Sequence, residues 1–303
     1  MHDTSESRFL PVDGYKIYVR TFGAKNTDRT LLCLHGGPGS THDYLLPLAD
    51  LARWGYRVVF YDALGCGRSD LPERNDLYTL EHDLLVLEEV RRSLGRERLH
   101  LMGSSYGGML ALAYACRHSE NLLSLNSTGG LCDVPFTTQE MQRLVRGLPA
   151  KTQTTLRKFE ARREYTHPEY EAAVNQFYHK HVCRLRPWPP EVESALSKMS
   201  RPVYSTMNGP NEFTILGNIR DIDFTADLHR ISVPTIILHG KYDEVTPAVG
   251  ERIHREIAGS TFHVFPKSSH VSFWEERATY LRLVRDFMRN AEKRGSRKPP
   301  RGA

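Results

Sequence analysis

A short apolar run that ends in a glycine-rich turn constrains the fold of this 303-residue chain more than any other feature. The stretch at 99–108 reads LHLMGSSYGG, and the apolar sequence MLALAYACRH follows. The run predicts a buried strand, and the residues after the turn predict a helix. Between them, residues 103–107 match the pattern G-x-S-x-G with Ser105 at the centre. This pattern is typical of a sharp turn in which small residues on both sides let strand and helix approach closely.

The same alternation of strand and helix recurs along the chain. Continuous apolar strands that alternate with helices predict a mostly parallel sheet in an α/β fold, because such strands are buried on both faces. An N-terminal hairpin is expected at 8–22, where the alternating pattern turns at Asp13-Gly14. Further strands are predicted within 30–39, 56–70, 98–103, 121–130, 233–240 and 260–266, and helices within 79–94, 106–118, 251–259 and 277–290.

The pattern changes between residues 133 and 227, where the chain becomes mostly helical, polar and aromatic. In this segment Thr137 and Glu140 resemble a capping box at the start of a helix. We therefore predict a core made of residues 1–132 and 228–290, interrupted by a helical cap at 133–227. An insertion above the carboxyl edge of a parallel sheet is placed to cover a site at that edge.

Charge and cysteine content argue against several classes of protein. The net charge is +5, but six basic residues and one acid lie from Arg289 onward, so the rest of the chain is balanced. We therefore expect no nucleic-acid partner, and we expect a flexible basic tail at 291–303. No apolar run has the length of a signal peptide or a membrane span. Five cysteines without paired spacing favour a cytoplasmic protein with reduced thiols, and neither a metal nor a cofactor is expected.

Ser105 is either a nucleophile or part of an ordinary tight turn. Its predicted place at a helix N-terminus favours the nucleophile, because free backbone amides there stabilise developing negative charge. Ser104 precedes the apex and is expected to be only a small packing residue. A serine nucleophile needs a base and an orienting acid, which follow it in the order Asp or Glu, then His. Asp243 and His270 fit this order, since each follows a predicted strand at its carboxyl end, as Ser105 does.

A second glycine-rich loop, HGGPG at 35–39, follows the first buried strand. Glycines let backbone amides face a ligand without side-chain obstruction. The amides of Gly37 and Tyr106 are the expected donors to an oxyanion, although a simple turn is the alternative for this loop. The third loop, at 62–69, is expected to hold the fold in register. Cys66 in that loop has no predicted base or acid beside it.

Together these motifs resemble the α/β-hydrolase superfamily, and within it the proline iminopeptidase family of serine aminopeptidases. The resemblance extends from about residue 8 to 288 and rests on HGGPG, YDALGCGRSD, GSSYGG and KYDEVTP. The branch that contains the tricorn-interacting aminopeptidase is similar in GSSYGG, in MNGPNEFTILGNIRD and in HVFPKSSH. Narrowly proline-selective members tend to have Trp after the nucleophile, whereas this chain has Tyr106.

The resemblance implies the α/β-hydrolase fold with an inserted helical cap, and it implies roles for particular residues. Ser105, Asp243 and His270 correspond to the catalytic triad, and the oxyanion donors are again Gly37 and Tyr106. The resemblance also implies that Glu212 and Glu244 correspond to the family's ligands for the substrate α-amino group. Gly36 is a further expected substrate-binding residue, and Tyr204 is expected to line the side-chain pocket together with the aromatic-rich insertion.

The expected function is therefore a serine exopeptidase that releases N-terminal residues, proline and others, from short peptides with a free N-terminus. A functional link to a larger protease is a further expectation. Two alternatives remain open from the sequence. One is an amino-acid amidase or esterase of the same fold, whose pocket would not need the free amine. The other is a hydrolase-like binding protein with little turnover of its own.

Overall fold

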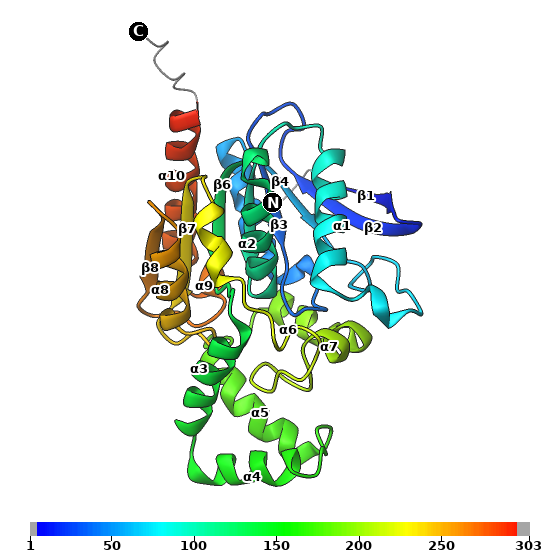
Figure 1. Ribbon diagram of the computed structural model, residues 1–303, viewed down its shortest axis with the longest axis vertical. Coiled ribbons are helices and arrows are strands. Elements are labelled where there is room, and N and C mark those ends of the chain that lie inside the picture. Colours follow the sequence, from blue (N-terminus) through cyan, green and yellow to red (C-terminus); the bar gives the residue numbers. More distant parts are fainter. Residues whose placement is uncertain (1–4, 296–303) are drawn as a thin grey trace.

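The computed structural model describes residues 5–295 and is built around one eight-stranded sheet (Figure 1). The strand order is β1-β2-β4-β3-β5-β6-β7-β8. The first two strands form the predicted N-terminal hairpin, and β2 also pairs antiparallel with β4. Every other neighbouring pair is parallel, which confirms the predicted α/β class. The strands are β1 (Ser5–Val12), β2 (Tyr15–Phe22), β3 (Thr30–Leu34), β4 (Arg57–Tyr61), β5 (Leu99–Ser104), β6 (Leu122–Thr128), β7 (Thr235–Gly240) and β8 (Thr261–Phe265).

Helices cover both faces of the sheet because the central strands are apolar on both sides. In β3, Leu32 and Leu34 pack into one apolar cluster, whereas Leu31 and Cys33 pack into another. The first cluster includes side chains of α1 (Leu80–Ser93), α2 (Tyr106–His118) and α8 (Pro247–Glu256). The second includes side chains of the 3-10 helix η1 (His42–Trp54), α9 (Ser272–Glu275) and α10 (Arg277–Gly295). Alternate side chains of a strand point to opposite faces, so the strands β3, β4, β5 and β7 contribute to both clusters.

Five helices lie between β6 and β7, and they gather at one end of the sheet, at the bottom of Figure 1. They are α3 (Val134–Arg146), α4 (Ala150–Glu160), α5 (Pro168–His181), α6 (Pro190–Ser197) and α7 (Arg201–Met207). We call this group the cap helices. Short 3-10 turns, η2 (Asn75–Leu77), η3 (Ser119–Asn121) and η4 (Thr225–Arg230), complete the secondary structure of the described part.

The first cap helix begins earlier than the sequence pattern predicts. Asp133 is the N-cap residue of α3, and its side chain accepts a hydrogen bond from the Phe136 amide at 2.9 Å. The predicted capping box at Thr137 and Glu140 was therefore wrong. Thr137 lies inside the helix, and Glu140 accepts a hydrogen bond from Thr246 on the core, at 2.7 Å. Pro135 favours a helix that starts at this point, because proline has no backbone N–H and the first turn of a helix leaves such groups without a partner. Asp133 is then in position to cap the helix.

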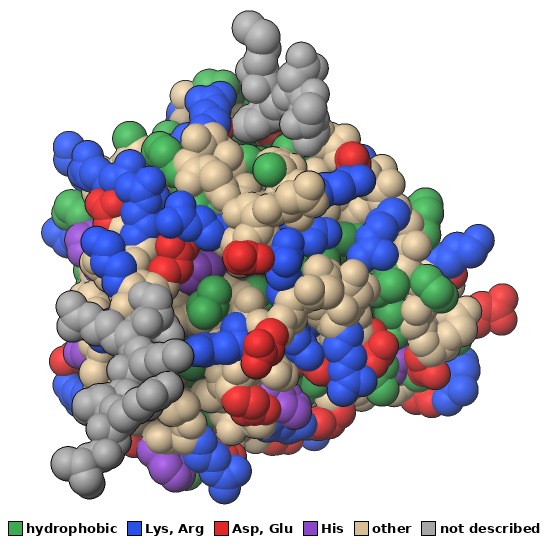
Figure 2. Space-filling view, turned by 90° about the horizontal axis from the view of Figure 1, so that it is seen from above, with side chains coloured by type: hydrophobic (Ala, Val, Ile, Leu, Met, Phe, Trp, Pro, Cys, Tyr) green, Lys and Arg blue, Asp and Glu red, His purple; other side chains and the backbone are tan. Residues whose placement is uncertain are grey.

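The predicted basic tail begins later than expected. Residues 291–295 continue α10, so the tail prediction was wrong for them. Glu292 explains the difference, because it accepts a hydrogen bond from Tyr56 at 2.9 Å and lies 3.1 Å from Arg29. Residues 296–303 lie outside the described part. At this end of the molecule, Figure 2 shows Lys and Arg side chains interspersed with Asp and Glu.

Within residues 5–295, no helix is both long enough and apolar enough to cross a membrane.

Candidate active site

The turn between β5 and α2 holds Ser105 in a strained backbone conformation. Its φ of 60° and ψ of −126° are unusual for a residue with a Cβ atom. The Ser105 amide donates to the Thr128 carbonyl on the neighbouring strand at 2.9 Å, which helps to hold this conformation. Ser105 lines a cavity, whereas Ser104 is fully buried. The two adjacent serines therefore have different surroundings.

Glycines are required around Ser105 because other chain segments lie very close. A Cβ atom on Gly103 would overlap the Gly107 carbonyl. One on Gly107 would lie 2.4 Å from the Leu34 carbonyl oxygen, and one on Gly36 would lie 2.7 Å from the Ser105 Cβ. These distances are shorter than van der Waals contact, so a side chain at any of the three glycines would displace backbone at the turn.

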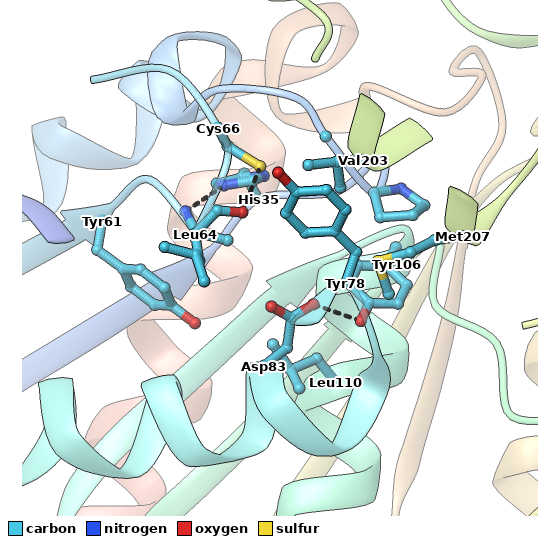
Figure 3. A pocket seen from close by; sticks show the side chains of 13 residues that line it. His35, Tyr61, Leu64, Cys66, Tyr78, Asp83, Tyr106, Leu110, Val203 and Met207 are labelled. Carbon is cyan, nitrogen blue, oxygen red and sulfur yellow. Dashed lines mark hydrogen bonds between the residues drawn. The ribbon is translucent and has the colours of Figure 1, made fainter. Parts of the chain in front are cut away.

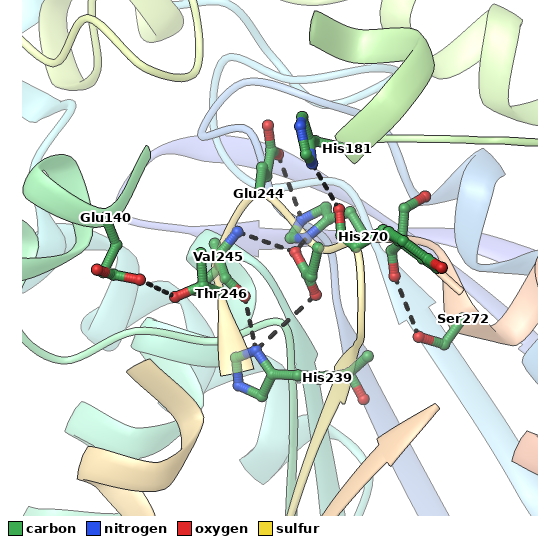
Figure 4. A network of polar contacts seen from close by, with 12 residues as sticks. Glu140, His181, His239, Glu244, Val245, Thr246, His270 and Ser272 are labelled. Carbon is green, nitrogen blue, oxygen red and sulfur yellow. Dashed lines mark hydrogen bonds and ion pairs between the residues drawn. The ribbon is translucent and has the colours of Figure 1, made fainter. Parts of the chain in front are cut away.

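Asp243 and His270 meet at the same edge of the sheet. Asp243 follows β7, His270 follows β8, and the His270 Nδ1 lies 2.6 Å from the Asp243 Oδ1. The same Asp243 oxygen accepts the Val245 amide at 2.9 Å, which orients the carboxylate (Figure 4). His270 lines the cavity that Ser105 also lines. Asp243 and His270 are 27 residues apart in the sequence, and Ser105 lies farther from both. The fold brings the three residues to the same edge of the sheet.

The charges around His270 favour its protonated form. Burial alone would lower its pKa, but the Asp243 charge and hydrogen bond, together with Glu244 and Glu212, raise the pKa to about 10. The Glu244 Oε1 lies 3.8 Å from the His270 Nε2, the ring nitrogen that Asp243 leaves free. The surrounding acids therefore stabilise the imidazolium, the form that a general base reaches once it has accepted a proton.

Glu212 and Glu244 line the cavity together with Ser105 and His270. Glu212 comes from the loop after α7, and its carboxylate accepts a hydrogen bond from Tyr204 at 2.8 Å. Burial raises the pKa of both glutamates, and for Glu244 the charge of Glu212 raises it further. The structure therefore places two carboxyl groups in the cavity that Ser105 lines: Glu244 is buried and Glu212 is half-buried. Tyr204 itself contacts Glu212 and is absent from the residues that line this cavity.

The HGGPG loop brings its backbone to the same cavity. Gly37 lines it and has a φ of 109°, a conformation that suits glycine. Within residues 5–295 no acceptor takes a hydrogen bond from the amide of Gly37 or of Tyr106. The Gly36 amide, in contrast, donates to the Tyr44 hydroxyl at 2.7 Å. Gly36 therefore lies against Ser105 with its amide already bonded inside the protein.

Tyr106 is absent from the residues that line the Ser105 cavity, and it lines a separate small pocket together with Tyr78 and Asp83 (Figure 3). Its hydroxyl donates to the Asp83 Oδ2 at 2.6 Å, and both residues are buried (Figure 3). Burial raises the pKa of Asp83 to about 7, although the hydrogen bond from Tyr106 opposes this shift. Asp83 lies on α1, so this contact links α1 to the turn. Nothing in the sequence pattern marked Asp83 as part of this turn.

Behind the HGGPG loop, the Asp62 carboxylate bonds to the amides of His42 and Arg68 at 2.9 and 3.0 Å. Asp62 thereby connects the loop at 62–69 to the start of η1, which supports the expected role of this loop in holding the fold in register. Cys66 is buried, and burial is the main cause that raises its pKa well above the ordinary value. A thiol in such surroundings is not activated as a nucleophile.

Much of the cavity wall is apolar and comes from the cap. Sequence motifs do not reveal these residues, because an apolar residue in a helix is compatible with any packed surface. Tyr44 on η1 belongs to the wall as well and was likewise not predicted. The apolar and aromatic lining residues are Tyr44, Val182, Trp188, Val192, Ala195, Leu196, Met199 and Val271.

Among the described residues, no cluster of three or more His, Cys, Asp or Glu side chains is arranged to hold a metal ion.

Comparisons with known proteins agree with this geometry. A family model for the alpha/beta hydrolase fold matches residues 29–277. A proline iminopeptidase of Thermoplasma volcanium is 47% identical over 285 residues, which cover 93% of this chain and 96% of the relative. A proline iminopeptidase of Saccharolobus solfataricus is 45% identical and covers 93% and 92%, respectively. The crystal structure of a Mycobacterium smegmatis proline iminopeptidase has a TM-score of 0.89 and 32% identity, and the match covers 96% of this chain and 100% of that chain.

The fold and the family match define this chain as an α/β hydrolase. With such identity over nearly the whole length of its relatives, it belongs more particularly to the proline iminopeptidase family. The chain is therefore an enzyme, a serine exopeptidase of the aminopeptidase class.

Proposed function

We propose that this enzyme releases the N-terminal residue, proline among others, from short peptides. Ser105 is the proposed nucleophile, His270 the general base and Asp243 the acid that orients His270. The observation that carries the proposal is the content of one cavity: Ser105 and His270 line it together with the carboxyl groups of Glu212 and Glu244. Carboxyl groups enclosed in a cavity are suited to hold a cationic substrate group.

The proposed reaction proceeds through an acyl-enzyme. The Ser105 Oγ attacks the carbonyl carbon of the N-terminal residue, and the His270 Nε2 takes the hydroxyl proton. The amides of Gly37 and Tyr106 donate hydrogen bonds to the oxyanion. The C–N bond then breaks while His270 returns its proton to the leaving amine. Water, activated by His270, hydrolyses the ester and releases the amino acid.

The two glutamates explain why only the first peptide bond is cut. Glu212 and Glu244 bind the α-ammonium group and thereby set the distance from the N-terminus to Ser105. An internal peptide bond lacks the cation and would leave both carboxyl groups without a positive partner from the substrate. Tyr204 contributes indirectly, because its hydrogen bond orients Glu212. For Gly36 we propose a steric role in substrate binding: its lack of a side chain leaves Ser105 accessible.

We propose that residues 133–227 act as a cap over this site. The cap supplies Glu212 and most of the apolar wall, so it selects substrates by size as well as by charge. We further propose that the enzyme belongs to the branch containing the tricorn-interacting aminopeptidase, on the motifs described above. In this view it acts in the cytoplasm on peptides that a larger protease supplies. The five unpaired cysteines, four of them buried, suit a reducing compartment.

Product analysis tests this proposal. The enzyme is incubated with a short peptide that begins with proline, and the products are identified by mass spectrometry. We expect free proline and an otherwise intact shortened peptide, and no turnover by Ser105→Ala. Internal fragments, or unchanged activity of the Ser105→Ala variant, would contradict the proposed function.

A further inference from the structure

The C-terminal end of cap helix α5 contacts both loops that carry the proposed acid and base. The backbone carbonyl of His181, the last residue of α5, accepts two hydrogen bonds. One comes from the Glu244 amide at 3.2 Å, and the other comes from the His270 amide, also at 3.2 Å. A single oxygen atom of the cap therefore joins the loop after β7 to the loop after β8.

The side chain of His181 makes a third connection to the same region. Its Nδ1 lies 2.8 Å from the Tyr242 carbonyl oxygen, next to Asp243 in sequence. Because a carbonyl oxygen only accepts, Nδ1 must carry the hydrogen atom. Burial lowers the pKa of His181, as do Lys180 and Arg184, whereas the Tyr242 hydrogen bond and the Asp243 charge oppose this. The ring is thus suited to act as a neutral donor.

Residues just beyond His181 extend the contact. The Ser269 hydroxyl donates to the Val182 carbonyl at 3.0 Å, and the Arg184 amide donates to Glu275 at 2.6 Å. Glu275 in turn accepts a hydrogen bond from the Ser269 amide. Ser269 directly precedes His270, so the segment at 181–184 holds the His270 loop from two sides.

His181 does not touch the reacting atoms. It is absent from the residues that line the cavity, whereas its neighbour Val182 is present. Figure 4 shows its ring beside the segment that carries Glu244, on the cap side of His270. Any effect of His181 on the reaction must therefore act through the loops that it joins.

We propose that His181 is a positioning residue that aligns Asp243 and His270 from the cap. Its carbonyl and its ring fix the two loops relative to each other. Loss of these hydrogen bonds would remove the contacts that align the acid–base pair. The inference rests on the proposed roles of Asp243 and His270. It links the cap to catalysis, because a displacement of about 1 Å at a reacting group costs on the order of 10²-fold in rate.

Three variants separate alignment from simple stability. His181→Leu removes the ring donor to Tyr242, whereas His181→Asn keeps an N–H near the position of Nδ1. His167→Leu is the matched control at the other end of α5, because His167 caps the helix by accepting the Glu169 amide at 3.2 Å. This control weakens the same helix without touching either loop. The measurements are Tm, kcat and KM on a proline anilide, and the rate at which a fluorophosphonate labels Ser105.

We expect His181→Leu to lower both kcat and the labelling rate by about 10- to 100-fold with little change in KM. His181→Asn should restore both rates to within a few-fold of wild type. His167→Leu should lower Tm and leave both rates unchanged. Labelling reports on the triad alone, because a fluorophosphonate carries no α-ammonium group.

Equal labelling rates for wild type and His181→Leu would overturn the inference and leave the proposed function intact. A loss of rate in His167→Leu that matches the loss in His181→Leu would also overturn it, since helix stability would then explain both. If wild-type enzyme is not labelled at all, the proposed nucleophile fails and the inference fails with it.

Discussion

His270 lies among three acids, and this arrangement makes its protonation depend on what occupies the cavity. Asp243 and Glu244 approach it from the loop after β7, Glu212 approaches from the cap, and His239 on β7 is a further titratable neighbour. A substrate ammonium group between the two glutamates would offset their negative charge. The pKa of His270 would then fall, and the base would become available when a substrate with a free amine is bound.

Substitution of Glu244 by Gln tests this arrangement with two substrates. Removal of one negative charge near His270 lowers its pKa, so a larger fraction of the base is unprotonated at pH 7. We expect kcat/KM for a simple uncharged ester to rise about 3- to 10-fold at pH 7, with the acidic limb of the pH profile shifted to lower pH. For a proline anilide, kcat/KM should fall by roughly 10- to 100-fold, because a charge-assisted contact is lost.

Glu140→Gln is the control for this experiment, because Glu140 bonds to Thr246 nearby and does not face His270. It should leave the ester profile unchanged. An unchanged ester profile in Glu244→Gln would show that Glu244 only contacts the substrate and does not set the pKa of His270.

The raised pKa of Asp83, which lies behind the β5–α2 turn, leads us to predict an unusual dependence of stability on pH. Its pKa is about 7 in the folded protein against an ordinary value of 3.8, so the folded state binds more protons than the unfolded state between these values. Stability therefore falls as pH rises from about 4 to 7 and stays lower above that range. Asp83→Asn keeps an acceptor for Tyr106 but removes the buried charge.

We expect the free energy of unfolding of Asp83→Asn to exceed that of wild type by roughly 2 to 4 kcal/mol at pH 9, with no difference near pH 4. Urea unfolding at the two pH values measures this. A variant less stable than wild type at pH 9 would mean that the Asp83 carboxylate, not the carboxylic acid, is the form the core accommodates.

The turn between β5 and α2 leaves no space for a side chain larger than hydrogen at Gly103 or Gly107. Gly107→Ala would push a methyl group against the Leu34 and His35 carbonyl oxygens, so we expect a loss of roughly 3 kcal/mol in stability and of most activity. Gly147→Ala is the matched control, since it follows a helix, has a φ of −83° and would meet only the Leu144 carbonyl, at 3.1 Å. Thermal unfolding and anilide turnover of both variants measure the difference. Full activity in Gly107→Ala would show that the turn is less tightly packed than described.

The elements were predictable where local pattern and tertiary packing agree. The strands at 30–34 and 99–104 were foreseen because buried parallel strands are continuously apolar, and Thr79 caps α1 through the His82 amide at 3.2 Å. The start of α3 was not foreseen, because Asp and Thr are both common N-cap residues and the sequence offers Asp133 as well as Thr137. Two features of the structure select Asp133: Pro135 lies in the first turn of the helix, and the backbone of Asp133 pairs with that of Asp223. The end of α10 depends on the contacts of Glu292 with Tyr56 and Arg29, which are distant in sequence.

At the scale of the whole molecule, the site forms where the core and the cap meet. The proximity of Asp243 and His270 followed from strand order, because parallel strands end at one edge of the sheet. The links of Tyr106 to Asp83 and of His181 to the two loops had no motif to mark them. They depend on how α1 and the cap pack against the core, and a single sequence does not encode that packing as a local pattern.

The central claim concerns the whole cavity: Ser105 acts on the residue whose free amine Glu212 and Glu244 hold. The most direct measurement compares kcat/KM for a proline anilide and for its N-acetylated form. Acetylation removes the cation that the two carboxyl groups would bind, so we predict a decrease of at least about 100-fold. Equal values for the two substrates would contradict the account, because the free amine would then play no part in selecting the bond that is cut.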